Sequence, residues 1–157
     1  MTAAARPYVA VAGSGGAPAE DLAAAERLGR ALAERGAVVV CGGLGGVMEA
    51  ACRGAKSAGG TTVGILPTLD RADANPFVDV AVPTGLGEAR NALVVRAADA
   101  LVAVGGEWGT LSEIALAMRA GKRVVGLGTW ELSRAGRPVE GIVRAGDPDE
   151  AAALALG

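Results

Sequence analysis

Short runs of β-branched and other apolar residues recur along this chain, and three of them end at glycine before a stretch with helical spacing begins. Runs of this length bounded by turn formers are typical of buried strands. They predict strands over residues 8–13, 37–41, 61–66, 77–82, 99–104 and 123–127. The stretches between them repeat apolar residues every three or four positions, which predicts helices. These helices should run from Pro18 to a stop at Gly36 and over 47–58, 86–98, 110–120 and 147–156.

Two further segments are less regular. Residues 68–76 gather Asp, Asn and Pro, so they are expected to form an exposed loop. Residues 138–144 are expected to add an edge strand. Within the helix over 86–98, we expect Ala89, Leu93 and Ala97 to face the core.

Strand and helix alternate throughout, which is typical of a parallel sheet covered on both faces. No linker or internal repeat divides the 157 residues, so we expect one α/β domain over 1–157. Its predicted fold is a doubly wound, Rossmann-like, mostly parallel sheet with helices on both faces. The aromatic residues are only Tyr8, Phe77, Trp108 and Trp130, so Val, Ala, Leu and Ile must build the core.

Composition narrows the classes of partner and chemistry. The net charge is −2 and no basic run exceeds Lys122-Arg123, so we expect no nucleic-acid partner. No apolar segment is long enough to span a bilayer and the first residues lack a signal-peptide layout, so we expect no membrane association. Cys41 and Cys52 are then expected to be reduced thiols in a cytoplasmic protein. The chain has no histidine, which removes Ser-His-Asp catalysis and the commonest metal ligand; we expect no metal and no required cofactor.

Three glycine-rich turns, at residues 13–16, 42–46 and 105–109, share one design of buried strand, glycines and helix start. In open parallel sheets, ligands bind at the carboxyl ends of the strands. Helix N-termini carry unpaired N–H groups, and glycine lets the backbone approach an anion closely. We therefore predict a site for a small phosphorylated ligand, made by these turn residues: Gly13, Ser14, Gly15, Gly42, Gly43, Gly45, Gly46, Gly105, Gly106, Gly109 and Thr110. Alternatively, the glycines serve only tight turns and close packing.

Familiar nucleotide-binding fingerprints do not match these turns. Pro18 stands where a GxGxxG pattern requires its third glycine, and Cys41 ends the second strand without the acid that would bind a ribose. The chain also has no GxxxxGK[ST] sequence. The predicted phosphate site must be of another type.

The most specific stretch reads GGEWGTLSE over residues 105–113, and GGLGGVMEAACRGAKSAGGTTVGILP lies upstream of it. Both segments resemble the LOG family, formerly known as the lysine decarboxylase family, and the resemblance extends from residue 8 to about 130. The resemblance implies that Arg90 and Glu113 correspond to the catalytic pair of phosphoribohydrolases, which cleave the N-glycosidic bond of nucleoside 5′-monophosphates.

The chain departs from these hydrolases at several positions. Val104 replaces a proline of their motif, and Asn91 stands where they have lysine. In these respects it is more similar to shorter relatives that include the molybdenum cofactor carrier proteins. That similarity implies binding of the cofactor's pterin phosphate without turnover, and a homodimer or larger homo-oligomer.

Several residues keep two interpretations. Thr110-Leu111-Ser112-Glu113 fits a capping box, which would make Glu113 structural; otherwise its carboxylate stabilises developing oxocarbenium charge. Arg90 either grips phosphate or is a solvated surface residue. Trp108 either stacks on a purine or pterin or packs on another subunit. We expect the phosphate on the amides of Gly109 and Thr110, with Arg90, Asn91, Trp108 and Glu113 around the ligand. The function is then a carrier-like binding protein, a phosphoribohydrolase or a non-enzymatic assembly protein.

Overall fold

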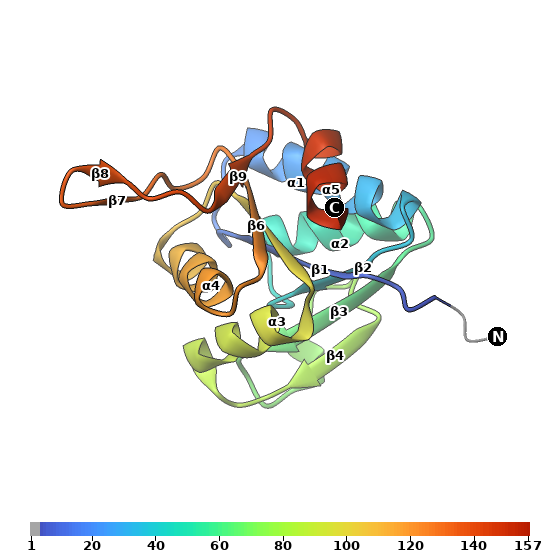
Figure 1. Cartoon of the computed structure of the whole chain (residues 1–157). Coiled ribbons are helices and arrows are strands. Elements are labelled where there is room, and N and C mark those ends of the chain that lie inside the picture. Colours follow the sequence, from blue (N-terminus) through green and yellow to red (C-terminus); the bar gives the residue numbers. More distant parts are fainter. Residues whose placement is uncertain (1–3) are drawn as a thin grey trace.

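The computed structural model describes residues 4–157, and it contains one seven-stranded sheet in which every pair of neighbours is parallel. The strand order is β4-β3-β2-β1-β5-β6-β9 (Figure 1). The bounds are β1 Tyr8–Gly13, β2 Val38–Cys41, β3 Thr61–Leu66, β4 Val80–Pro83, β5 Ala100–Val104, β6 Arg123–Leu127 and β9 Ile142–Arg144. The predicted doubly wound α/β fold is confirmed.

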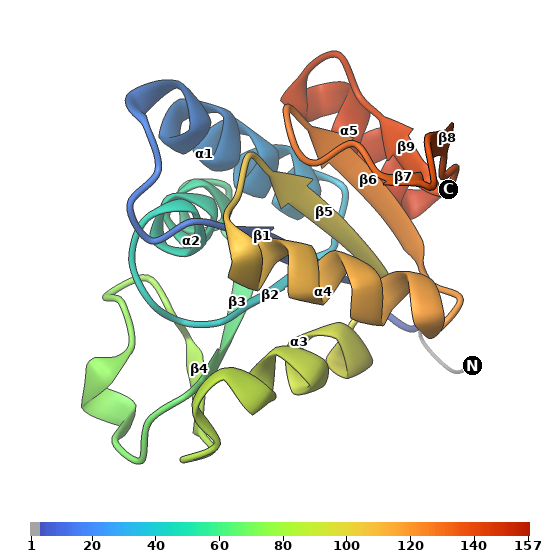
Figure 2. The same ribbon diagram turned by 90° about the vertical axis from the view of Figure 1, so that its left-hand side faces the viewer.

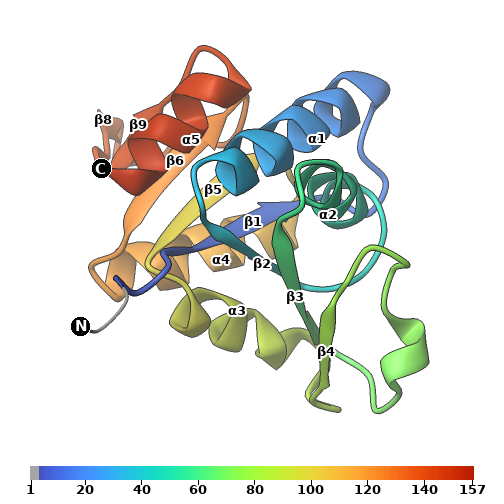
Figure 3. The same ribbon diagram turned by 90° about the vertical axis from the view of Figure 1, so that its right-hand side faces the viewer.

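Helices cover both faces of this sheet. One face carries α1 (Ala19–Glu34), α2 (Val47–Ser57) and α5 (Pro148–Leu156), as Figure 3 shows. The other face carries α3 (Asn91–Ala97) and α4 (Trp108–Arg119), which lie side by side (Figure 2). Each layer has its own core of Val, Leu, Ile and Ala side chains packed on the strands. No helix within residues 4–157 is both long and apolar enough to cross a membrane.

The direction of winding changes at β1. From β1 the chain builds outward to β4 on one side, and it then crosses to β5 on the other side and continues to β9. The carboxyl ends of β1 and β5 therefore adjoin while their connections lead to opposite sides. Open α/β sheets form their ligand crevice at such a switch point.

The helix predicted over 86–98 differs from the structure in its register. It starts as a 3₁₀ turn, η2 (Gly87–Arg90), before α3 begins, and the predicted inward residues Ala89, Leu93 and Ala97 are exposed. The buried positions are instead Asn91, Val94, Val95 and Ala98. A 3₁₀ turn has three residues per turn, so a stripe extrapolated with the α-helical period through it is rotated off the true face.

The edges of the sheet are shorter than predicted. The strand expected over 77–82 begins only at Val80, and the loop over 68–76 contains a 3₁₀ turn, η1 (Arg71–Asp73). Within 138–144 only β9 joins the sheet. Arg137–Pro138 instead forms β8, which pairs with β7 (Ser133–Arg134) in a hairpin that projects from the body (Figure 1).

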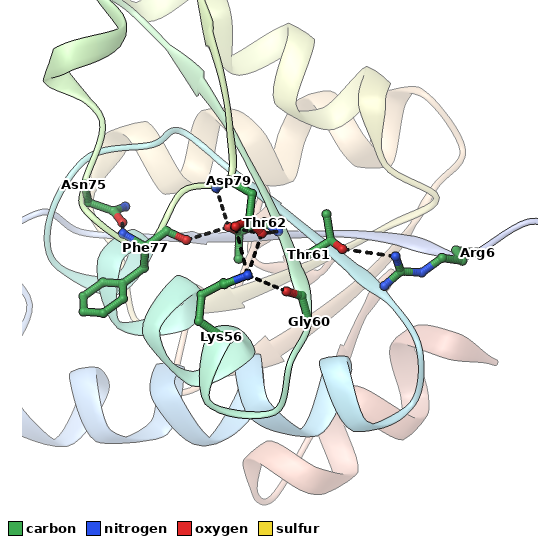
Figure 4. A network of polar contacts seen from close by, with 8 residues as sticks. All are labelled: Arg6, Lys56, Gly60, Thr61, Thr62, Asn75, Phe77 and Asp79. Atoms are coloured by element: carbon green, nitrogen blue, oxygen red, sulfur yellow. Dashed lines mark hydrogen bonds and ion pairs between the residues drawn. The ribbon is translucent and has the colours of Figure 1, made fainter.

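A polar network fixes the segment between β3 and β4 to the sheet (Figure 4). Lys56 Nζ lies 2.9 Å from an Asp79 carboxylate oxygen and donates to the Gly60 carbonyl at 3.0 Å. Asp79 also accepts from the Thr62 amide, and Thr62 Oγ1 donates to the Phe77 carbonyl. Although burial raises the pKa of Asp79, the hydrogen bonds from Lys56 and Thr62 bring it below its ordinary value.

Candidate functional site

A pocket of about 210 Å³ lies at the switch point between β1 and β5. It brings together eight of the residues predicted from sequence: Gly13, Ser14, Gly15, Arg90, Asn91, Gly109, Thr110 and Glu113. Four lining residues were not predicted: Val11, Ala12, Met48 and Glu107. Val11, Ala12 and Met48 carry no polar group that sequence reasoning would single out, whereas Glu107 stood inside the glycine motif.

The other predicted residues do not line this pocket. They are Gly42, Gly43, Gly45, Gly46, Gly105, Gly106 and Trp108. Gly105 and Gly106 border a separate crevice of about 290 Å³ with Gly128, Thr129 and Trp130. The three glycine turns, which look equivalent in sequence, therefore have different positions relative to the pocket.

The first and second turns are packed directly against each other. The Val47 amide donates to the Ser14 carbonyl at 3.1 Å. A Cβ atom at Gly46 would lie 2.2 Å from that same oxygen, and the φ of +67° at Gly46 already disfavours any other residue. A Cβ at Gly13 would lie 2.5 Å from Val47. At Gly13 and Gly46, close packing is thus sufficient to require glycine.

The second turn is also held from outside by a residue that sequence reasoning missed. The Asn75 amide donates to the Gly43 carbonyl, and its Nδ2 donates to the Leu44 carbonyl, both at 2.9 Å. The Gly43 amide donates to Cys41 Sγ at 3.3 Å, so it is not free for a ligand. The only sequence signal for Asn75 was its place before Pro76 in a loop rich in turn formers.

The N-terminus of α4 presents backbone donors to the pocket. The helix begins at Trp108 with Glu107 as its N-cap, and in the described part of the chain the Glu107 side chain makes no capping hydrogen bond. The Leu111 amide donates to the Glu107 carbonyl at 3.0 Å. Within residues 4–157, no group accepts a hydrogen bond from the amides of Gly109 or Thr110. Two unpaired donors at the positive end of a helix favour an anion there.

The capping box expected at residues 110–113 is absent from the described part of the chain. Because α4 starts at Trp108, Thr110 lies inside the first turn rather than at the cap. Glu113 therefore does not cap the helix in the way that the capping-box pattern over residues 110–113 suggested. It lies on the buried side of α4 and lines the pocket, with 7% of its surface exposed.

Arg90 reaches the pocket from the end of η2. Its Nη2 donates to the Gly42 carbonyl at 3.4 Å, and its Nη1 donates to Asn91 Oδ1. Asn91 Nδ2 donates in turn to Ser112 Oγ at 3.1 Å, and that hydroxyl donates to the Gly109 carbonyl. The guanidinium is thereby connected to the first turn of α4. Its Nε is buried and finds no acceptor among residues 4–157.

Glu113 faces this guanidinium without forming an ion pair within the described residues. Burial raises the pKa of Glu113 to about 7, and the attraction of Arg90 only partly opposes that effect. The carboxyl is therefore largely protonated below neutral pH. In that state the pocket combines a cationic side chain and two free amides with no opposing negative charge from Glu113.

Trp108 lies beside the pocket rather than in it. Its indole is 74% exposed and packs against Trp130, with ring centroids 5.2 Å apart and the planes tilted by 39°. Trp130 Nε1 donates to the Glu107 carbonyl at 3.3 Å. The two rings are thus attached to the loop that leads into α4.

Comparison with known proteins places this architecture in a family. The SLOG cluster4 family matches residues 6–152. The chain belongs to this family. This SLOG protein is 48% identical to an uncharacterized protein from Archaeoglobus fulgidus over 119 residues, which are 76% of the chain and 78% of that relative.

Two solved structures resemble this SLOG protein over nearly its whole length. The molybdenum cofactor binding protein from Rippkaea orientalis is 34% identical, with a TM-score of 0.86 over 97% of this chain and 96% of that one. The molybdenum cofactor carrier protein from Chlamydomonas reinhardtii is 35% identical, with a TM-score of 0.81 over 97% of each chain. The predicted resemblance to the LOG-like superfamily, nearest to the molybdenum cofactor carriers, is confirmed.

Proposed function

We propose that this SLOG protein binds a phosphorylated, nucleotide-like small molecule at the switch-point pocket, as a binding protein of the molybdenum cofactor carrier type. The observation that carries the proposal is the pair of unpaired amides of Gly109 and Thr110 beside Arg90. Support also comes from the Rippkaea orientalis and Chlamydomonas reinhardtii proteins, whose similarity covers nearly the entire chain.

The residues present fit a phosphate monoester such as the one on a pterin cofactor. A phosphate oxygen at the end of α4 would accept from the amides of Gly109 and Thr110. The Arg90 guanidinium has more donors than its two acceptors among residues 4–157 use, and its planar fork suits an oxyanion. Gly15, exposed at the end of the first turn, leaves room for the group attached to the phosphate.

In this proposal the pterin cofactor is cargo rather than a resident cofactor. Within residues 4–157, no cluster of three His, Cys, Asp or Glu side chains is placed to hold a metal ion. The protein would hold such a cargo through its phosphate. Retention then depends on the α4 amides and Arg90.

A second candidate function rests on Glu113. A buried carboxyl with a pKa of about 7 next to an arginine is the kind of group that phosphoribohydrolase chemistry would use. Cleavage of an N-glycosidic bond develops positive charge on the ribose, which an ionised Glu113 would stabilise while Arg90 holds the phosphate. A purely packing role, as in an assembly protein, has geometric support in each of the three turns. An added Cβ would lie within 2.6 Å of another residue at Gly13, Gly42, Gly43, Gly46, Gly105 and Gly106.

One pair of assays separates these functions. Isothermal titration with AMP should give saturable binding to the wild-type protein. Replacing Arg90 with Ala should weaken it by at least tenfold, because a hydrogen bond to a charged group contributes about 1.5–3 kcal/mol. Arg96→Ala is the matched control, since Arg96 is exposed on α3 and does not line the pocket.

The second assay follows release of free base from AMP and N6-substituted AMP by chromatography. The carrier proposal expects no release, and retention of molybdopterin through gel filtration. Base release that disappears in Glu113→Gln would establish the hydrolase instead. Equal AMP binding by wild type and Arg90→Ala would refute the proposed phosphate site.

A further inference from the structure

A groove of about 550 Å³ runs between α3 and α4 and adjoins the switch-point pocket. Asn91 and Gly109 line both spaces, so the groove begins where the proposed phosphate site ends. Its walls are formed largely by the carbon atoms of Ala89, Ala92, Leu116 and Trp108. Resting on the proposed function, we propose that this groove holds the planar heteroaromatic ring of the phosphorylated ligand, stacked on Trp108.

The position of Trp108 in the chain is the first reason. Trp108 directly precedes Gly109, whose amide is one of the two proposed phosphate donors. An aromatic face next to a phosphate-binding helix end suits a ligand that carries a ring close to its phosphate. Purine nucleotides and pterin phosphates both have this construction, whereas a simple sugar phosphate does not.

The exposure and support of the indole are the second reason. Trp108 is 74% exposed, although burying a large aromatic side chain is strongly favourable in water. The ring of Trp130 packs against it with centroids 5.2 Å apart, and Trp130 Nε1 donates a hydrogen bond to the Glu107 carbonyl. These contacts restrict the movement of the Trp108 indole. A side chain held in place yet left exposed offers a preorganised stacking surface.

The shape of the groove is the third reason. On the side of η2 and α3 the groove is lined by Ala89 and Ala92, whose single methyl groups occupy little of its volume. Ser112 and Glu88 supply polar atoms at its border. Apolar walls with a few polar groups are typical of sites for small heterocyclic ligands.

The test compares two probes that share a phosphate and differ in the ring. Formycin 5′-monophosphate carries a purine-like ring on a carbon–carbon bond that a phosphoribohydrolase cannot hydrolyse, and ribose 5-phosphate carries no ring. Replacing Trp108 with Ala should raise the Kd for formycin monophosphate about five- to 150-fold, the range expected for loss of one stacked base. The Kd for ribose 5-phosphate should stay within about twofold. Leu93→Ala is the matched control, because Leu93 is an exposed apolar residue of α3 outside the groove.

A second readout reports on Trp108 directly. The chain has two tryptophans, so Trp130→Phe leaves Trp108 as the only indole. Its fluorescence should be quenched saturably by AMP, and ribose 5-phosphate should leave it unchanged. The Trp130→Phe substitution keeps an aromatic ring beside Trp108 but removes the hydrogen bond from Trp130 Nε1 to the Glu107 carbonyl.

The outcomes separate this inference from the proposed function. If wild type binds ribose 5-phosphate as tightly as formycin monophosphate, or if Trp108→Ala weakens both equally, the ring site is refuted and the phosphate site stands. If wild type binds neither probe, the phosphate site is refuted and the ring site with it. If Trp108→Ala converts an oligomer to a monomer in light scattering and leaves both Kd values unchanged, a second copy occupies the groove and the inference is overturned.

Discussion

At the scale of single residues, Arg90 and Glu113 stand out because each has a buried polar group that lacks a hydrogen-bond acceptor or an ion-pair partner among the described residues. The buried Nε of Arg90 lacks an acceptor, and the Glu113 carboxyl is buried beside the guanidinium without an ion pair. Buried polar groups without partners are uncommon, and they concentrate at functional sites. Both side chains line the pocket, where two α4 amides are also without an acceptor among residues 4–157.

Glu113 should make the stability of the protein depend on pH. Burial raises the folded-state pKa to about 7 from an ordinary value of 4.5, so the folded state binds the proton more tightly than the unfolded state. Its contribution to stability is therefore fully present below pH 4.5 and is lost as the pH rises to 7. We expect the Glu113 contribution to the free energy of unfolding to fall by roughly 3 kcal/mol over this interval.

Urea denaturation at pH 4.5, 6 and 8 measures this effect. Glu113→Gln should remove the decline attributed to Glu113 and should be more stable relative to wild type at pH 8 than at pH 4.5. Glu140→Gln, at an exposed glutamate, should keep the wild-type slope. A constant difference between wild type and Glu113→Gln across the three pH values would contradict the raised pKa.

At the scale of elements, the three glycine turns have separate tasks. The turn after β1 packs on the start of α2, and the turn after β2 is fastened by Asn75 and Cys41. The turn after β5 leads into α4, whose Gly109 and Thr110 line the pocket with amides that find no acceptor among residues 4–157. The first two turns thus pack against each other beside the pocket, and the third carries the amides that we propose bind the phosphate.

The contact between the first two turns can be tested with neighbouring glycines of the same turn. Gly46→Ala should destabilise the protein by about 2–4 kcal/mol, because its Cβ would meet the Ser14 carbonyl at 2.2 Å and its φ is +67°. Gly45→Ala should change stability by less than about 1 kcal/mol, since an added Cβ there meets nothing within 4 Å. Equal free energies of unfolding for the two variants would contradict the packing role of Gly46.

Many of the helices and strands could be predicted from sequence, because a buried parallel strand appears as a short continuous run of apolar residues. The runs over 8–13 and 61–66 match β1 and β3 at both ends, and the glycines that follow β1 do line the pocket. The register of α3 could not be predicted, since a 3₁₀ turn changes the period and a polar residue, Asn91, is buried.

The parts of the site that were missed depend on contacts between distant segments. Asn75 reaches the second turn from a loop about thirty residues away, and no local pattern encodes that contact. The capping-box interpretation of Thr110 and Glu113 failed because the helix begins two residues before Thr110. The residue types of a capping box are present there, but the position of the helix start determines that Glu113 lines the pocket instead of capping the helix.

At the scale of the whole molecule, the sheet order brings the site together. The change of winding at β1 sets the end of β1 next to the end of β5, and α3 and α4 lie side by side on one face of the sheet (Figure 2). The resulting pocket and the groove beside it form one continuous region along α4. The relatives from Rippkaea orientalis and Chlamydomonas reinhardtii share this architecture over at least 96% of their chains.

The central claim is that the amides of Gly109 and Thr110 bind the phosphate of the ligand. A ¹H–¹⁵N correlation spectrum of the labelled protein, titrated with AMP, observes these two groups individually. We expect both signals to move saturably and among the most strongly in the spectrum, as does an N–H that gains a charged acceptor. Saturable shifts elsewhere, with the Gly109 and Thr110 signals unmoved, would contradict the claim.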